Sequence, residues 1–136
     1  MTMTLRDTLS AEHAELDQLA ETLLTMVSEP RPPAAFSATR WRLNHVLTVH
    51  LAKEDQHLYP TLQQSDNAGT RALADRFAHE MGGLAAAHQA YCATWPIEAV
   101  EADWTGFRRE TRLVMTLLRQ RIQREETQLS TRLDLH

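Results

Sequence analysis

The sequence predicts an all-α protein folded as an up-down-up-down four-helix bundle. Four segments carry apolar residues at helical spacing, clusters of proline, glycine and polar residues separate them, and no stretch shows the sustained two-residue alternation of a strand. Four amphipathic helices joined by short connections bury their apolar stripes against one another. The chain of 136 residues is long enough for a buried core, and we expect one domain over residues 1–136.

The first helix is expected over residues 5–27 and the second over residues 43–58, because leucine and valine recur there at helical spacing. Residues 29–35, with the sequence EPRPPAA, separate these helices, since proline lacks an amide donor and clashes with the preceding turn. The polar cluster SDNAGT at residues 65–70 predicts a turn after the second helix.

The third helix is expected over residues 73–95 and the fourth over residues 107–129, where apolar stripes of the same period lie. Residues 95–103, with the sequence WPIEAVEAD, separate them. Asp103 is the expected N-cap of the last helix, because a short carboxylate accepts hydrogen bonds from the first free amides.

Composition narrows the class of protein. The net charge of −4, with scattered lysine and arginine, argues against nucleic acid as a partner. The single cysteine, Cys92, allows no internal disulfide, and no basic head with an apolar run marks a signal peptide. No apolar run approaches the roughly 18 residues of a membrane span. We therefore expect a cytoplasmic protein without a membrane or nucleic-acid partner, and the sequence leaves a homodimer open.

The stretch HLAKEDQHLYP, residues 50–60, places charged and imidazole side chains within the second apolar stripe. At about 100° per residue, His50 and Glu54 point into that stripe, whereas His57 lies at its edge. The i, i+4 spacing of His50 and Glu54 puts both side chains on one face of the helix, one turn apart. His13 lies inside the first stripe by the same measure. These patterns predict that His13, His50 and Glu54 face the core.

The third and fourth helices supply further acidic side chains. Glu80 lies inside the third stripe, whereas the neighbouring His79 points away from it. Glu125 lies inside the fourth stripe and Glu126 only at its edge. The sequence therefore favours Glu80 and Glu125 as the inward-facing groups of these two helices.

Folding the helices about their connections brings one set of polar side chains to the same level of the core: His13, His50, Glu54, Glu80 and Glu125. Each ionised carboxylate buried there without a partner costs several kcal/mol, which a bound cation would offset. Nitrogen and oxygen ligands without a thiolate suit iron, manganese or zinc. The set predicts a metal site inside the bundle.

The same residues also have explanations that need no metal. His13 could be a core-edge histidine that is hydrogen-bonded to a neighbouring helix. Glu80 could pair with Arg76, and Glu125 with Arg121, since each arginine precedes its glutamate by one helical turn. The joint convergence of all five side chains favours the metal site over these separate explanations.

The motif EHAEL near the start and HLAKEDQHLYP at the end of the second helix resemble the hemerythrin-like family, also called the HHE cation-binding domain. The resemblance covers nearly the whole chain, and its most specific part is His-x-x-x-Glu-[Glu/Asp]-x-x-Leu-[Tyr/Phe]-Pro. It implies a non-haem iron protein in which carboxylates bridge two irons between the helices. Members bind dioxygen or serve in oxygen, nitric oxide, peroxide or iron sensing.

By this resemblance, His13 and His50 would be metal ligands and Glu54 a bridging carboxylate. The fourth helix repeats the motif, since RIQREETQL at residues 121–129 matches HLAKEDQHL in its acidic pair and closing leucine. Glu125 would therefore take the second bridging role.

The chain departs from the family pattern at two places. Arg121 stands where the repeat should offer a histidine, and it cannot coordinate because it stays protonated. The third helix of the family usually supplies histidines, and here His79 lies beside Glu80. The sequence thus fits a carboxylate-rich di-iron centre or a single metal with Arg121 filling the gap, where the arginine could steer a bound anion or peroxide.

Three functions are compatible with these patterns. The first is a metal-binding carrier or sensor of dioxygen or nitric oxide. The second is a metal-dependent oxidase or peroxide-consuming enzyme, which would need an open coordination position. The third is a metal-free bundle that binds a partner. We expect the first, with iron as the metal, manganese or zinc as alternatives, and a small ligand such as O2, NO or peroxide.

Overall fold

A computed structural model describes residues 3–135. These residues are helical apart from short connections and contain no strand, which confirms the predicted all-α class. The elements are α1 (Leu5–Met26), α2 (Phe36–Lys53), η1 (Glu54–Leu58), α3 (Tyr59–Gln63), α4 (Ala68–Thr94), α5 (Ile97–Ala102), α6 (Trp104–Arg124), η2 (Glu125–Leu129) and η3 (Ser130–Leu135). Within this range, none of the helices is both long and apolar enough to cross a membrane.

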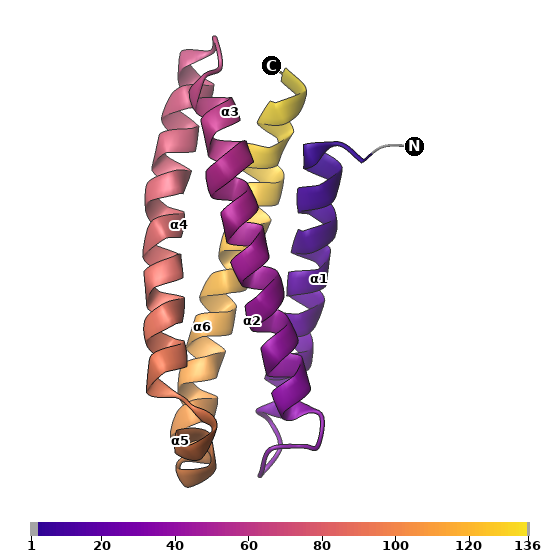
Figure 1. The fold of residues 1–136 in the computed structure, drawn as a ribbon, viewed down its shortest axis with the longest axis vertical. Coiled ribbons are helices and arrows are strands. Elements are labelled where there is room, and N and C mark those ends of the chain that lie inside the picture. The colour runs from indigo at the N-terminus through magenta and orange to yellow at the C-terminus, as the bar shows by residue number, and fades with distance from the viewer. Residues whose placement is uncertain (1–2, 136) are drawn as a thin grey trace.

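The long helices lie side by side along one axis (Figure 1). The chain descends through α1, returns through α2, η1 and α3, descends again through α4, and ascends through α6. The start of α1, the α3 turn and the end of the chain therefore lie at one end of the bundle. α1 packs against α2 and α6, and α4 packs against α3, α6 and η2.

Side-chain caps fix where three of the long helices begin. Thr4 and Asp7 form a reciprocal capping box at the start of α1, and the Asn67 side chain accepts from the amide of Thr70 at the start of α4. Asp103 caps α6, as expected, by accepting from the amide of Gly106 at 2.9 Å. A Cβ atom on Gly106 would clash with the Asp103 carboxylate, so a larger residue at this position would displace the capping side chain.

Two helices depart from regular geometry at equivalent places. In η1 the amide of Tyr59 donates to the carbonyl of Glu54, and in η2 the amide of Ser130 donates to the carbonyl of Glu125. These are wide, π-type turns with i→i+5 hydrogen bonds, a geometry that occurs often at functional sites. The second helical segment thus continues past residue 58 to Gln63, which the apolar stripe did not predict. The predicted connection at residues 95–103 also contains the short helix α5.

The apolar core consists of two clusters along the bundle axis. One lies towards α5 and includes Leu16, Leu47 and Phe107, and the other lies towards α3 and includes Leu9 and Leu58. Between these levels, the buried residues of α1, α2 and η1 are His13, His50 and Glu54. The core is therefore interrupted by one polar layer, and that layer holds the residues of the candidate site.

The cluster towards α5 depends on an aromatic group around Phe107. The rings of Phe36, Tyr91, Trp95 and Trp104 have centroids 5.5–6.0 Å from that of Phe107, which is fully buried. Contacts of this kind add stability beyond the apolar area that they bury. Phe107 is thus the residue that joins the ends of α2, α4 and α6.

We expect Phe107→Ala to lower the free energy of unfolding by about 3–5 kcal/mol, because it empties a fully enclosed volume. Leu113→Ala is the matched control on the same helix, since Leu113 is 64% exposed, and its effect should stay within about 0.5 kcal/mol. Denaturant unfolding followed by circular dichroism measures both. Equal losses for the two variants would contradict this account of the core.

Candidate metal centre

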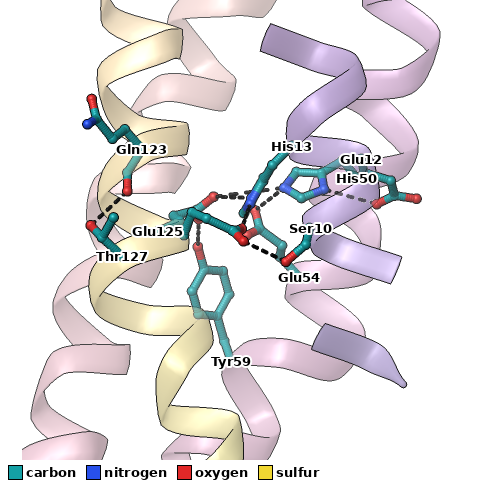
Figure 2. Close-up of polar contacts among 10 residues, drawn as sticks. Ser10, Glu12, His13, His50, Glu54, Tyr59, Gln123, Glu125 and Thr127 are labelled. Atoms are coloured by element: carbon teal, nitrogen blue, oxygen red, sulfur yellow. Dashed lines mark hydrogen bonds and ion pairs between the residues drawn. The ribbon is translucent and has the colours of Figure 1, made fainter. Parts of the chain in front are cut away.

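The polar layer brings together two histidines and two glutamates from four elements. His13 comes from α1, His50 from α2, Glu54 from η1 and Glu125 from η2. All four are buried, with at most 3% of their surface exposed. One ligand atom from each lies within 4.8 Å of those of the other three, and Figure 2 shows these side chains pointing towards one another.

The inner atoms of the group are closely spaced. His13 Nε2 lies 3.2 Å from Glu125 Oε1, and His50 Nε2 lies 3.4 Å from Glu54 Oε1. Glu125 Oε1 is also 3.8 Å from His50 Nε2, so this oxygen faces both imidazoles. The two rings are 4.6 Å apart between centroids and tilted by 60°. The four side chains thus surround a single small volume.

Several inner atoms lack a hydrogen-bond partner. Both carboxylate oxygens of Glu54 and Nε2 of His50 are buried without a partner among the described residues. Buried polar groups are nearly always satisfied, so orphaned oxygens beside an orphaned nitrogen call for an explanation. Two nitrogen and two carboxylate donors facing one volume form a donor set that suits iron, manganese or zinc. The residues present therefore fit a bound cation.

Outer carboxylates orient both imidazoles. Nδ1 of His13 lies 2.6 Å from Glu126 Oε2, and Glu126 also accepts from the Ser10 hydroxyl at 2.6 Å. Nδ1 of His50 lies 3.0 Å from Glu12 Oε1, and Glu12 also pairs with Lys53. In a neutral imidazole whose Nδ1 donates to a carboxylate, the inward Nε2 carries no proton and can bind a cation. Metal-binding histidines commonly have such a carboxylate partner.

Glu125 is held by a tyrosine as well as by histidine. The buried hydroxyl of Tyr59 donates to Glu125 Oε2 at 2.9 Å, while Oε1 faces the imidazoles (Figure 2). Burial and the neighbouring carboxylates Glu125 and Glu54 raise the pKa of Tyr59, so its hydroxyl keeps its proton and remains a donor. Glu125 is therefore fixed on both of its oxygens.

The two inner glutamates have opposite pKa shifts. Burial raises the pKa of Glu54 to about 8, and the charge of Glu125 adds to this although His50 opposes it. Burial also disfavours the charge on Glu125, but the adjacent imidazoles of His13 and His50 outweigh it and lower the pKa of Glu125 to about 2. Burial opposes charge on His50, yet the neighbouring carboxylates of Glu125, Glu54 and Glu12 raise its pKa to about 10. Without a cation, the group therefore retains protons near neutral pH.

A groove between α1 and α6 lies beside this group. It has a volume of about 640 Å³, and its lining includes Ser10, His13 and Glu126. His13 is thus the residue that both lines the groove and faces the inner volume. The other three members of the group do not line the groove and are buried behind it.

Comparison with known families agrees with this geometry. The family model described as the hemerythrin HHE cation-binding domain matches residues 4–133.

The chain belongs to this hemerythrin family.

No significant match was found among curated proteins or among solved structures. The family match covers nearly the whole described chain, including every residue of the polar group. The family's description as cation-binding and the buried histidine–glutamate group together suit metal binding.

Of the residues predicted to face this layer of the hemerythrin-like chain, Glu80 lies outside the group. Its carboxylate is paired with Arg121, and Arg124 Nη1 lies 3.4 Å from Glu80 Oε2. The helical position of Glu80 was inward enough to suggest a ligand, but two arginines of α6 hold the side chain at the edge of the bundle. Arg76, the expected alternative partner, is exposed.

The remaining residues that the sequence offered as candidates also lie outside the group of four. His79 and His57 are exposed, and neither lies in the polar group. Glu126, expected only at a stripe edge, binds the outer nitrogen of His13. Arg121 contacts Glu80 and does not pair with Glu125. The partners of Glu126 and Arg121 lie on other helices, so helical angles alone could not predict these two contacts.

Three residues of the site were not predicted: Ser10, Glu12 and Tyr59. Glu12 precedes His13 in EHAEL, and Tyr59 belongs to the LYP that closes the second motif. Both lie in the stretches that carry the family resemblance, and that was the available signal. Ser10 had none, because its role arises only where α1 meets η2.

We expect Glu12→Ala to weaken binding of an added divalent cation such as Fe(II) by about 10–100-fold, because His50 loses the carboxylate that orients its ring. Glu15→Ala is the matched control one turn along α1, where the carboxylate binds exposed Arg42. Competition with a chelator of known affinity measures both variants. Equal affinity of the Glu12 and Glu15 variants would remove the orienting role of Glu12.

We expect the metal-free protein to lose stability as the pH rises from 6.5 to 8. Folding raises the pKa of His50 from 6.5 to about 10 and that of Glu54 from 4.5 to about 8, so the folded state holds protons that the unfolded chain has released. The free energy of unfolding then falls by about 1 kcal/mol per pH unit for each such proton. Denaturant titrations in excess chelator test this, and a flat or rising profile would contradict it.

Proposed function

We propose that this hemerythrin-like chain binds non-haem iron through His13, His50, Glu54 and Glu125, and uses it to bind or sense dioxygen or nitric oxide. The observation that carries the proposal is the pair of unpartnered Glu54 oxygens, fully buried and facing two imidazoles. A cation is the simplest group that would satisfy these oxygens and the orphaned His50 nitrogen together. The scaffold of the proposed centre is the up-down-up-down four-helix bundle.

The donor set supports iron, manganese or zinc over calcium and magnesium. Two imidazoles and two carboxylates are intermediate between the all-oxygen sites of calcium or magnesium and the thiolate-rich sites of structural zinc. Manganese and zinc can use the same donors, so the choice of iron rests on the resemblance to the hemerythrin-like family. A bound iron ion would supply the redox and ligand-binding chemistry that the protein side chains lack.

The protein's own residues would prepare the site for such an ion. Glu12 and Glu126 hold the imidazoles so that Nε2 of each faces inward, and Tyr59 holds Glu125 through a second oxygen. The two apolar clusters exclude water above and below this layer. The groove beside His13 is the side from which a molecule as small as O2 or NO would reach such an ion. These features support a centre with one accessible side.

A second candidate function is a metal-dependent oxidase or peroxide-consuming enzyme. The buried hydroxyl of Tyr59, 2.9 Å from Glu125, is the observation that favours it, because a phenol beside a redox metal can be oxidised. Steady consumption of peroxide by the iron-loaded protein would support this candidate. Binding of dioxygen or nitric oxide without turnover would support the carrier or sensor.

The test of the proposed function compares two adjacent carboxylates. Purified protein is loaded with Fe(II) without oxygen, freed of excess metal and analysed for iron, melting temperature and absorption before and after exposure to air or NO. Glu54→Ala should lose most of the bound iron and the metal-induced rise in melting temperature, since ligands that bind only the folded state stabilise it. Asp55→Ala, which removes the exposed neighbouring carboxylate, should retain both.

Two results would contradict the proposal. Iron retention by Glu54→Ala at the wild-type level would remove Glu54 from the site. A wild-type protein that takes up no metal and keeps its melting temperature after iron addition would instead support a metal-free bundle that binds a partner.

A further inference from the structure

The second half of the chain repeats the first at its buried positions. At a constant offset along the sequence, the inward residues of α1 and its C-cap have counterparts on α4 and its C-cap, and all of them except Leu84 are buried. The residues Leu9, His13, Leu16, Leu23 and Val27 correspond to Phe77, Met81, Leu84, Tyr91 and Trp95.

A second correspondence, at an offset three residues longer, relates α2 and η1 to α6 and η2. The matching pairs are Phe36 with Phe107, Leu47 with Leu118, Glu54 with Glu125, and Leu58 with Leu129, and all eight residues are buried. In both halves the wide turn begins at the glutamate. The bundle thus consists of two similar helix pairs, and each pair contributes one inner carboxylate to the centre.

The nitrogen ligands do not follow this repeat. His13 corresponds to Met81, and His50 corresponds to Arg121. Glu54 and Glu125 are retained in both halves, but both imidazoles of the centre come from α1 and α2. A second ion related to the first by the repeat would therefore lack both of its histidines.

Arg121, the counterpart of His50, is held by an outer carboxylate as His50 is. In the first half, Glu12 of α1 accepts from His50 of α2. In the second half, Glu80 is the counterpart of Glu12, and it pairs with Arg121. The outer carboxylate is thus kept, while the residue that it holds has changed from imidazole to guanidinium.

This change acts against a second cation in two ways. A guanidinium has no lone pair to offer a metal and stays protonated. Its fixed positive charge also repels a second ion, since the side chain is only 19% exposed and like charges repel at short range. Met81, which is 4% exposed, offers only a thioether, a soft ligand poorly matched to iron held by carboxylates.

No other histidine among residues 3–135 fills the gap. His45, His57 and His79 are exposed. His88 is buried, but its Nε2 lies 3.1 Å from Asn44 Oδ1, and it does not belong to the polar group. The nitrogen donors available to the centre in this part of the chain are those of His13 and His50.

We infer that the centre holds one metal ion per chain, at His13, His50, Glu54 and Glu125, and that Arg121 and Met81 exclude a second ion from the corresponding position of the other half. The inference rests on the proposed function and gives the number of ions at that site. The carboxylates of Glu54 and Glu125, which would bridge two ions in a two-metal centre, both serve the single ion here.

The experiment counts metal ions in three proteins. Wild type, Met81→His/Arg121→His and the control Met81→His/Arg124→His are loaded with Fe(II) without oxygen, and iron is measured per chain by elemental analysis. Both variants gain two imidazoles in place of the same residue types, but Arg124, which also contacts Glu80, is not the counterpart of a ligand. We expect one ion in wild type and in the control, and two in Met81→His/Arg121→His.

A spectroscopic measurement supports the count if a variant folds poorly. After oxidation to the ferric state, wild-type protein should show the electron paramagnetic resonance signal of an isolated high-spin ion. Two carboxylate-bridged ferric ions would couple and lose that signal. This measurement needs only the wild-type chain, so the number of ions is tested whether or not the variants are stable.

The outcomes separate this inference from the function on which it rests. Two ions in wild type would overturn the inference and leave metal binding intact. No ion in wild type would overturn the proposed function itself. One ion in a well-folded Met81→His/Arg121→His protein would overturn the roles given to Met81 and Arg121.

Discussion

The burial of Glu54 opposite two imidazoles and a second carboxylate is the constraint on which the rest of the centre depends. Its oxygens have no hydrogen-bond partner among the described residues, and burial raises the pKa of its carboxyl to about 8. A group buried at this cost destabilises a helical bundle unless something offsets it. The inward Nε2 atoms of the two histidines define where the compensating charge would lie.

The surrounding structure keeps this arrangement in place. Apolar clusters lie on both sides of the polar layer, so its members are packed as well as hydrogen-bonded. Low polarity strengthens each hydrogen bond to a charged group and makes each missing one more costly. The outer carboxylates Glu12 and Glu126 are only partly buried, and they connect the enclosed imidazoles to solvent-facing Lys53 and to Ser10. The centre is therefore enclosed on the inside and more exposed to solvent at its rim.

Much of this could be predicted from the sequence, and the exceptions have physical causes. The helical class followed from apolar periodicity, and the inward positions of His13, His50, Glu54 and Glu125 followed from helical angles because those angles are local. Glu80 was misplaced because its position depends on arginines of another helix, which no helical angle encodes. Glu12 and Tyr59 were missed for the same reason: their partners come from other segments of the chain.

The wide turns have a further geometric consequence for the helices that carry them. One extra residue in a turn rotates everything beyond it by about 100° relative to an uninterrupted α-helix. Tyr59 and Leu62 follow such a turn, and both are buried. Removing one residue from η1 would restore regular winding but turn this terminal segment towards water. The extra residue in each wide turn thus changes the rotation of the helix, so that its side chains face the core both before and after the centre.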